Sequence, residues 1–91
     1  MFVVVSYDII DDKRRNKLAD LLKDYGTRVQ YSVFECSLDE KYLQQMIQEV
    51  RAIIDPEGDS LKIYYLCHRC AGNRESYGQK GSEPPDELVV I

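Results

Sequence analysis

The sequence contains no apolar run close to the roughly 18–20 residues that a helix needs to cross a bilayer. Its apolar start, from Phe2 to Tyr7, is interrupted by Asp8, and no basic segment precedes it. A secretory signal would combine a basic start with a longer apolar segment. We therefore expect neither a membrane segment nor export, and we place the protein in the cytoplasm.

The chain also lacks an excess of positive charge. Twelve lysine and arginine residues face 16 aspartate and glutamate residues, which leaves a net charge of −4. That balance excludes a protein that coats nucleic acid through bulk positive charge. A local basic patch is still compatible with it, because Arg14, Arg15 and Lys17 are neighbours in the sequence and Arg28 is expected to lie close in space.

Histidine and cysteine are scarce as well. His68 is the sole histidine, and no carboxylate is paired with it. Cys67 and Cys70 form a single CxxC motif, whereas a structural zinc site needs four ligands. Three interpretations stay open: reduced thiols, a zinc site completed by Cys36, His68 or a second copy of the chain, and a redox pair.

The 91 residues are enough for one domain over 1–91, with a core over 1–67. The β-branched start predicts a strand that is buried on both faces. A helix is expected over 11–25, capped by Asp11 or Asp12, with Gly26 at its C′ position. Two short strands follow over 28–36, with Tyr31-Ser32 as the tight turn between them.

The second half of the chain repeats this alternation. Ser37 and Glu40 resemble a capping box at the start of a second amphipathic helix. The segment 55–59, which contains proline and glycine, ends that helix. A strand that is partly apolar on both sides is expected over 60–66. An irregular segment and an apolar tail strand over 88–91 complete the chain.

The order strand, helix, strand, strand, helix, strand is the βαββαβ arrangement of the ferredoxin-like α+β fold. Right-handed crossovers place both helices on one face of the sheet. The apolar residues on the other face of the central first strand then need a different cover. We predict a homodimer in which the tail 88–91 adds a strand that packs on the partner.

Asp8 follows the first strand directly, at the sheet rim, where a carboxylate can still reach water. In this topology the Tyr31-Ser32 turn and the helix start with Arg14 and Arg15 belong to the same rim. Helix N-termini and arginine forks bind phosphate. One or two carboxylates are enough to hold Mg²⁺, and a two-fold axis would supply a second copy of Asp8.

Simpler roles stay open for each of these groups. Asp8 could be a cap or a solvated turn acid, and Asp11 and Asp12 are explained by capping although they could also be ligands. Arg14 and Arg15 could form a solvated helix face.

Two blocks of the sequence carry a family resemblance. Tyr7-Asp8-Ile9 with the segment 11–15, and the segment 25–36, closely resemble the CRISPR-associated protein two family, the small non-integrase subunit of the CRISPR adaptation machinery. The resemblance covers nearly the whole chain in length, element order and tail. The segment 28–35 is its most specific part.

The resemblance implies a homodimer of ferredoxin-like protomers. It implies a divalent cation, Mg²⁺ or another such as Mn²⁺, held between the two copies of Asp8. It also implies a metal-dependent endonuclease acting on RNA or double-stranded DNA, with Tyr7, Arg15, Arg28 and Phe34 at the cleft. Its implied partners are an integrase subunit and spacer DNA.

Three functions compete. An endonuclease and a non-catalytic adaptor that bridges integrase dimers and holds spacer DNA share every residue named so far. A small-ligand or metal carrier of the same fold would place its CxxC near the first loop, where this sequence has Asp8. No base-reading element is visible, so we expect binding to nucleic-acid backbone and shape.

Overall fold

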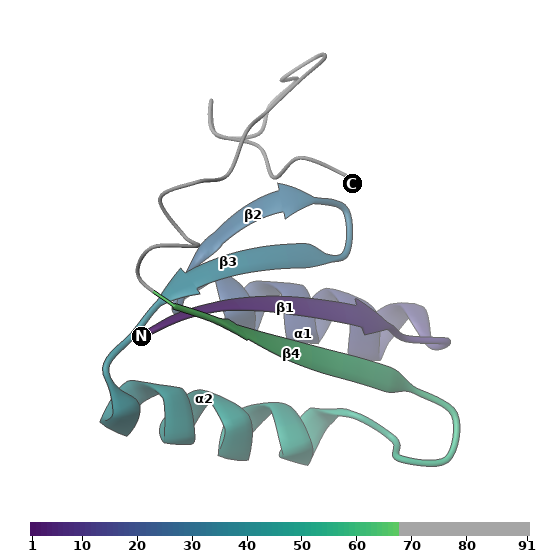
Figure 1. The fold of residues 1–91 in the computed structure, drawn as a ribbon. Coiled ribbons are helices and arrows are strands. Elements are labelled where there is room, and N and C mark those ends of the chain that lie inside the picture. The colour runs from purple at the N-terminus through teal and green to yellow at the C-terminus, as the bar shows by residue number, and fades with distance from the viewer. Residues whose placement is uncertain (68–91) are drawn as a thin grey trace.

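The computed structural model describes residues 1–67, so Cys70 and the expected tail strand lie outside the described residues. Six elements follow one another in the predicted order: β1 (Phe2–Asp8), α1 (Asp12–Lys23), β2 (Thr27–Gln30), β3 (Val33–Ser37), α2 (Glu40–Ile53) and β4 (Ser60–Leu66) (Figure 1). The predicted ferredoxin-like βαββαβ order is therefore confirmed for this part of the chain. Neither of its helices has the length and apolar character of a membrane span.

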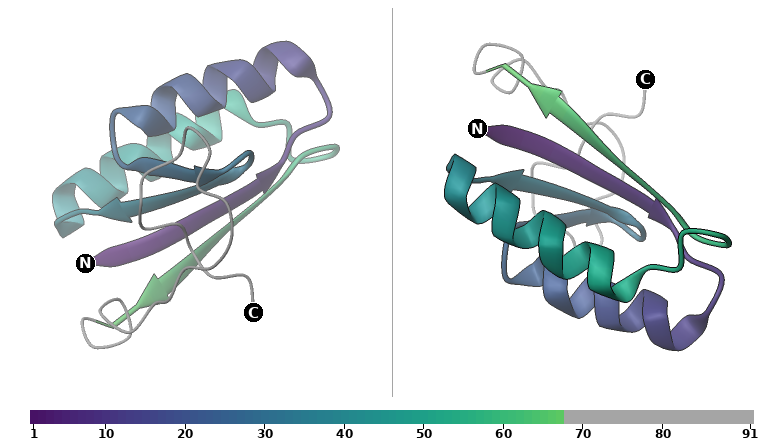
Figure 2. Two further views of the ribbon diagram at one scale, coloured as in Figure 1. Left: turned by 90° about the horizontal axis from the view of Figure 1, so that it is seen from above. Right: turned by 90° about the horizontal axis from the view of Figure 1, so that it is seen from below.

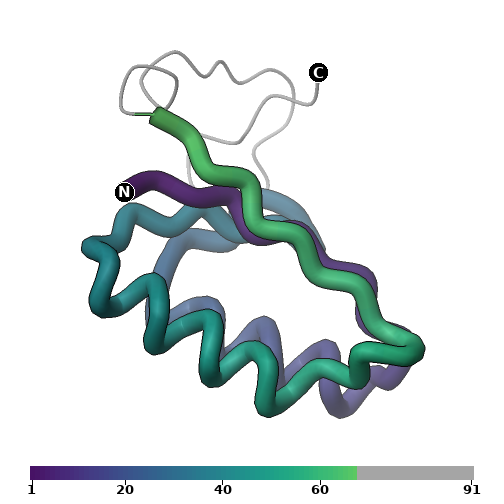
Figure 3. The backbone as a smooth tube through the Cα atoms, turned by 60° about the horizontal axis from the view of Figure 1, so that its bottom comes forward, coloured from purple at the N-terminus to yellow at the C-terminus, as the bar shows by residue number. Residues whose placement is uncertain are grey.

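The four strands form one sheet in the order β2-β3-β1-β4, and every neighbouring pair is antiparallel. β1 lies between β3 and β4, which makes it a central strand as predicted. Both helices cover the same face of the sheet (Figure 2), and the tube view shows them side by side beneath the strands (Figure 3). The other face carries no helix among residues 1–67.

The core lies between the helices and the sheet. Alternate residues of β1 face the helices, as the two-residue period of a strand requires. Those residues pack with the apolar stripes of both helices and with β3; the buried set includes Val3, Val5, Tyr7, Leu18, Leu22, Phe34, Leu43, Met46 and Val50. Val4, on the opposite face, is buried too, so β1 is buried on both faces as its composition predicts.

β4 is an edge strand of the sheet formed by residues 1–67, and these residues cover it only in part. Leu61 and Ile63 are partly buried against the core. Tyr64 and Tyr65 keep 51% and 57% of their surface exposed. Residues 1–67 do not cover both sides of this strand, so the expected cover stays a prediction.

The two helix starts differ in how well the sequence predicted them. Asp11 caps α1 as expected, and its carboxylate accepts the backbone N–H of Arg14 at 2.9 Å. The capping box predicted at Ser37 is wrong, because Ser37 is the last residue of β3 and pairs with Phe2 of β1. Asp39 is the N-cap of α2 instead.

The end of α1 also needs a correction. The helix stops at Lys23 with Asp24 as its C-cap, so Gly26 lies beyond the C′ position. The φ of Gly26 is outside the left-handed region that favours glycine. A side chain is excluded there for another reason: a Cβ atom would collide with the backbone oxygen of Glu35 and lie 2.5 Å from the Sγ of Cys36.

Candidate functional site

Asp8 ends β1 with an exposed side chain. Because Val5 and Tyr7 face the helices and side chains alternate along a strand, Asp8 belongs to the helix-free face. Its cross-strand neighbour is Ser60, at the start of β4. Within residues 1–67 the Asp8 carboxylate makes no hydrogen bond or ion pair, so its oxygens are available to a ligand.

A shallow hollow of about 260 Å³ opens beside Asp8, between β1 and β4. It is lined by two serines, two tyrosines, one lysine and the aspartate itself: Ser6, Tyr7, Asp8, Ser60, Lys62 and Tyr64. The described residues hold no group of three or more histidine, cysteine, aspartate or glutamate side chains that could enclose a metal. One exposed carboxylate suits Mg²⁺, which keeps several of its waters, and does not suit a closed zinc site.

Arg15 lies in the first turn of α1 and holds the segment that follows Asp8. Its NH1 donates to the carbonyl oxygen of Ile9 at 3.0 Å, and its NH2 pairs with the carboxylate of Asp12. The Nε of Arg15 is buried and has no hydrogen-bond partner within residues 1–67. The guanidinium therefore ties the Asp8 loop to the helix start.

Arg14 forms an ion pair with Asp59, which the sequence analysis treated only as part of a turn. Its Nε donates to Oδ2 of Asp59 at 2.9 Å, and its NH2 donates to Oδ1 at 3.1 Å. The buried Asp59 carboxylate also accepts the backbone N–H groups of Ile10 and Asp55. These contacts join the loop after β1 to the turn before β4. Because Nε and NH2 of Arg14 already donate to Asp59, the predicted phosphate contact of Arg14 is not visible in this arrangement and stays a prediction.

The Asp59 contacts predict an acid-sensitive stability. The hydrogen bond from Arg14, helped by the backbone donors, lowers the pKa of Asp59 to about 2. The ordinary aspartate pKa in an unfolded chain is about 3.9, so the stabilising contribution is complete above about pH 4 and is lost as the pH falls towards 2. Urea unfolding should therefore show a stability gap between wild type and Asp59→Asn that is widest near neutral pH and shrinks over this interval.

The control for that experiment is Asp20→Asn, which removes a carboxylate from an exposed pair with Lys23 on α1. Exposed pairs contribute little, so this variant should follow the wild-type curve. A gap for Asp59→Asn that stays constant from neutral pH to about pH 2 would contradict the assignment.

Arg28, on β2, lies over the turn between β2 and β3. Its Nε and NH2 both donate to the carbonyl oxygen of Tyr31, at 3.1 and 2.6 Å. Its Cζ lies 5.3 Å from the ring centroid of Tyr31 and 5.8 Å from that of Phe34. Arg28 also forms a hydrogen bond with the Tyr7 side chain. A guanidinium has five N–H donors, and these contacts do not use them all, so donors remain for a phosphate.

Tyr7 and Phe34 lie beneath this arginine. Their rings stack with centroids 6.3 Å apart, and both side chains are buried. The Tyr7 hydroxyl donates to the Tyr31 carbonyl at 3.3 Å. Burial raises the pKa of Tyr7, and the nearby Arg28 opposes that rise. Phe34 has no exposed surface, so the nucleic-acid role predicted for it would act through Arg28.

The predicted residues thus share one end of the sheet but divide between its two faces. The Tyr7 N–H donates to the Ser32 carbonyl at 3.1 Å, which places the β2–β3 turn beside the end of β1 as expected. Arg28 pairs across the sheet with Phe34, on the helix side. Asp8 lies on the opposite face. Residues 1–67 of one protomer therefore do not surround Asp8 with the predicted arginines.

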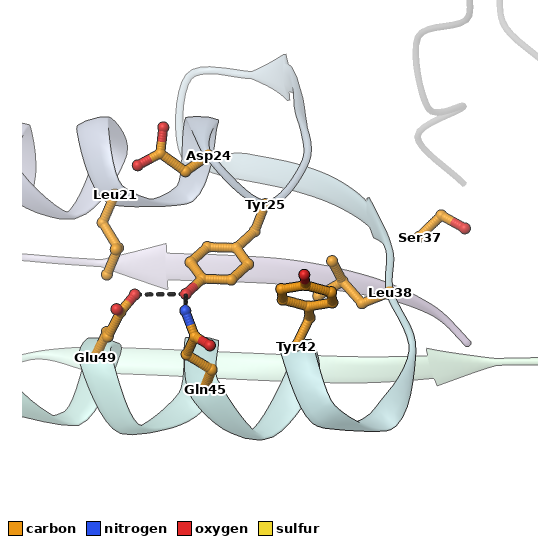
Figure 4. Close-up of a pocket in the computed structure, with 8 residues that line it drawn as sticks. All are labelled: Leu21, Asp24, Tyr25, Ser37, Leu38, Tyr42, Gln45 and Glu49. Atoms are coloured by element: carbon orange, nitrogen blue, oxygen red, sulfur yellow. Dashed lines mark hydrogen bonds between the residues drawn. The ribbon is translucent and has the colours of Figure 1, made fainter.

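A larger hollow, of about 550 Å³, lies near the C-terminal end of α1, at the opposite end of the molecule (Figure 4). The Tyr25 hydroxyl lies between α1 and α2 there, donating to Glu49 at 2.6 Å and accepting from Gln45 at 3.0 Å. Burial and the Glu49 contact raise the pKa of Tyr25. The hollow contains none of the predicted site residues.

Cys36 shows no sign of a reactive or metal-binding site. Cys36 is buried, and burial raises the pKa of its thiol to about 11. Such a thiol is unreactive and does not readily bind metal. Cys67 is exposed, while Cys70 and His68 lie outside the described residues.

Comparison with known proteins identifies the family. Residues 1–74 match the family model described as CRISPR associated protein Cas2. The chain belongs to the Cas2 family. This agrees with the resemblance seen in the sequence, and the match includes Asp8 and all the predicted arginines.

Similar proteins support the assignment. A Synechocystis Cas2 protein named a CRISPR-associated endoribonuclease is 42% identical over 96% of both chains. The structure of Cas2 from Streptococcus pyogenes is 36% identical, has a TM-score of 0.77, and is matched over 86% of this chain and all of its own. A chain of a partial Cas6-RT-Cas1–Cas2 complex is 28% identical over 98% of both chains, with a TM-score of 0.71.

Sequence analysis missed two groups of this site, the Asp59 carboxylate and the Tyr31 carbonyl. Asp59 stands in a turn-forming segment, and 45 residues separate it from Arg14. Tyr31 contributes a backbone carbonyl, which the identity of a side chain does not reveal. The one available signal was the position of both residues next to predicted strand ends, at the rim that already held Asp8.

Proposed function

We propose that this Cas2 family member is a dimeric, divalent-metal-dependent endonuclease of CRISPR adaptation, acting in the cytoplasm on phosphodiesters of RNA or double-stranded DNA. The observation that carries the proposal is the exposed Asp8 carboxylate, which ends the central strand with no intramolecular partner among the described residues. The endoribonuclease name of the Synechocystis relative supports it.

Asp8 is the residue that would hold the cation, Mg²⁺ or another divalent ion. When bound, such an ion polarises a phosphoryl oxygen and lowers the pKa of a coordinated water. Arg28 would bind the phosphate through its remaining N–H donors, while the Tyr31 carbonyl holds the guanidinium in position. Arg15 would keep the Asp8 loop in place through the Ile9 carbonyl.

A second protomer would explain why the described residues of one chain place a single carboxylate, that of Asp8, at the proposed metal site. Asp8 belongs to the face of the sheet without helices, which is the face a second copy could cover. A two-fold axis near the end of β1 would bring two Asp8 side chains together. Two close carboxylates repel each other, so a divalent cation between them is favourable.

The alternative is a non-catalytic adaptor that bridges integrase dimers and holds spacer DNA. It is favoured by the relative found in a Cas1–Cas2 complex, and by the spread of Asp8 and Arg28 over two faces of the protomer. A cleavage assay on highly purified protein, with Mg²⁺ or with a chelator, separates the two functions. Asp8→Asn that cannot cleave yet still supports spacer integration would favour the adaptor.

Binding to nucleic acid should depend on Arg28 through charge and not through base identity. Arg28→Ala is expected to weaken binding similarly for unrelated sequences, and to reduce the slope of log affinity against log salt by about one unit. Titrations at several salt concentrations measure both effects.

Lys41→Ala is the control for that titration, because it removes one positive charge from the first turn of α2, at the other end of the molecule. It should leave the slope unchanged. A loss for Arg28→Ala that is confined to one sequence would show base readout and contradict the prediction.

A further inference from the structure

Tyr31 is the most exposed tyrosine in the part of the chain that the structure describes. Its side chain is in the turn between β2 and β3 and keeps 69% of its surface exposed. Tyr42, Tyr64 and Tyr65 are also more than half exposed. Among the four, a cation lies over the ring of Tyr31 alone, within residues 1–67.

The backbone beneath this ring is fixed by several hydrogen bonds. The Tyr31 carbonyl accepts three: two from the Arg28 guanidinium and one from the Tyr7 hydroxyl. The next carbonyl, of Ser32, accepts the backbone N–H of Tyr7. A ring on such a turn needs little further ordering when it binds a ligand, so less conformational entropy is lost on binding.

We propose that Tyr31 is a stacking platform for one unpaired nucleobase, with Arg28 on the adjoining phosphate. Arg28 lies over one face of the ring, and the exposed surface leaves room for a base. Aromatic side chains bind single strands in this way whatever the base, because every base has a flat π-face. The inference rests on the proposed nucleic-acid binding and adds a strand preference to it: single strands or frayed ends bind at Tyr31, and paired bases do not.

The test compares one oligonucleotide as a single strand and as a blunt duplex, with 2-aminopurine at one position to report stacking. Tyr31→Ala removes the ring but keeps the backbone carbonyl that holds Arg28, so the phosphate contact should survive. Tyr31→Phe keeps the ring, and Tyr42→Ala removes another tyrosine ring that is more than half exposed. Circular dichroism checks that all the variants are folded.

Tyr31→Ala is expected to weaken single-strand binding by about 5- to 150-fold, the range for loss of one base-stacking contact. It should also abolish the quenching of 2-aminopurine, while duplex affinity changes less than about two-fold. Tyr31→Phe and Tyr42→Ala should match wild type. Equal losses for single strand and duplex, or an equal loss in Tyr42→Ala, would overturn the platform.

Different results would refute the proposed nucleic-acid binding and the stacking platform at Tyr31. A wild-type protein that binds neither nucleic acid would refute the proposed function and the platform together. A wild-type protein that binds both, with normal salt dependence and no effect of Tyr31→Ala, would refute the platform alone.

Discussion

Asp8→Asn is expected to reduce metal-dependent cleavage by about 100-fold or more while the protein stays folded. Loss of a residue that merely supports a metal ligand typically costs 10- to 100-fold, and Asp8 is proposed as the ligand itself. The side chain is exposed at the end of β1 and has no partner among the described residues that its loss would leave unpaired. Cleavage and Mg²⁺ binding are measured on the same preparations.

Asp11→Asn is the matched control, because it makes the same chemical change three residues further along the same loop. Asp11 caps α1 by accepting the Arg14 N–H, and asparagine caps a helix about as well as aspartate. This variant should keep both activity and stability. Full cleavage by purified Asp8→Asn would reject Asp8 as the catalytic centre.

Mixed dimers test whether the cation is shared. If equal amounts of wild-type and Asp8→Asn chains are unfolded and refolded together, random pairing leaves about a quarter of the dimers with both carboxylates. Activity should fall to that level if both copies of Asp8 are needed. Activity near one half would show that each protomer works alone and would reject the shared site.

Gly26→Ala is expected to destabilise the protein by about 3 kcal/mol, at the upper end of the range for inserting a methyl group into a packed site. A Cβ atom on Gly26 would collide with the backbone oxygen of Glu35 and would lie 2.5 Å from the Sγ of Cys36. Both obstacles belong to β3, and the Cys36 side chain is fully buried. The strand would have to move away from the end of α1.

Gly58→Ala provides the comparison for this stability measurement. A Cβ atom there would meet only the Cδ1 of Ile10, at 3.2 Å, which is the far end of a flexible and exposed side chain. Urea unfolding should show a small change for Gly58→Ala and a large fall in midpoint for Gly26→Ala. Equal midpoints for the two variants would show that β3 yields to the added methyl group.

Local patterns were sufficient to predict the fold. Apolar residues recur at helical spacing in both helices: Leu18 and Leu22 in α1, and Leu43, Met46 and Val50 in α2. This spacing predicted two amphipathic helices, each with an apolar face that packs against the sheet. The two-residue turn at Tyr31-Ser32 was predicted between two short strands, and the structure confirms it. Element order then left little choice of topology, since crossover handedness restricts the alternatives.

The same local reasoning failed where a neighbour distant in sequence decides the conformation. Ser37 has a good capping sequence around it, yet pairing with Phe2, which is distant in sequence, keeps it in β3, and the cap is Asp39. Gly26 stands where a helix should end, but the crowding by Glu35 and Cys36 is what requires a glycine.

The site divides in the same way. The sequence alone determined that the carboxylate of Asp8 ends a buried strand at a rim with basic residues nearby. Burial and charge can be predicted there because they follow from the types of residue that adjoin Asp8 in the chain. Only the tertiary structure showed that Arg14 pairs with Asp59 and that Arg28 donates to the Tyr31 carbonyl. It also placed Asp8 on the face of the sheet opposite to Arg28. Those outcomes depend on contacts between residues far apart in the chain and on backbone groups that every residue shares, so no local pattern encodes them.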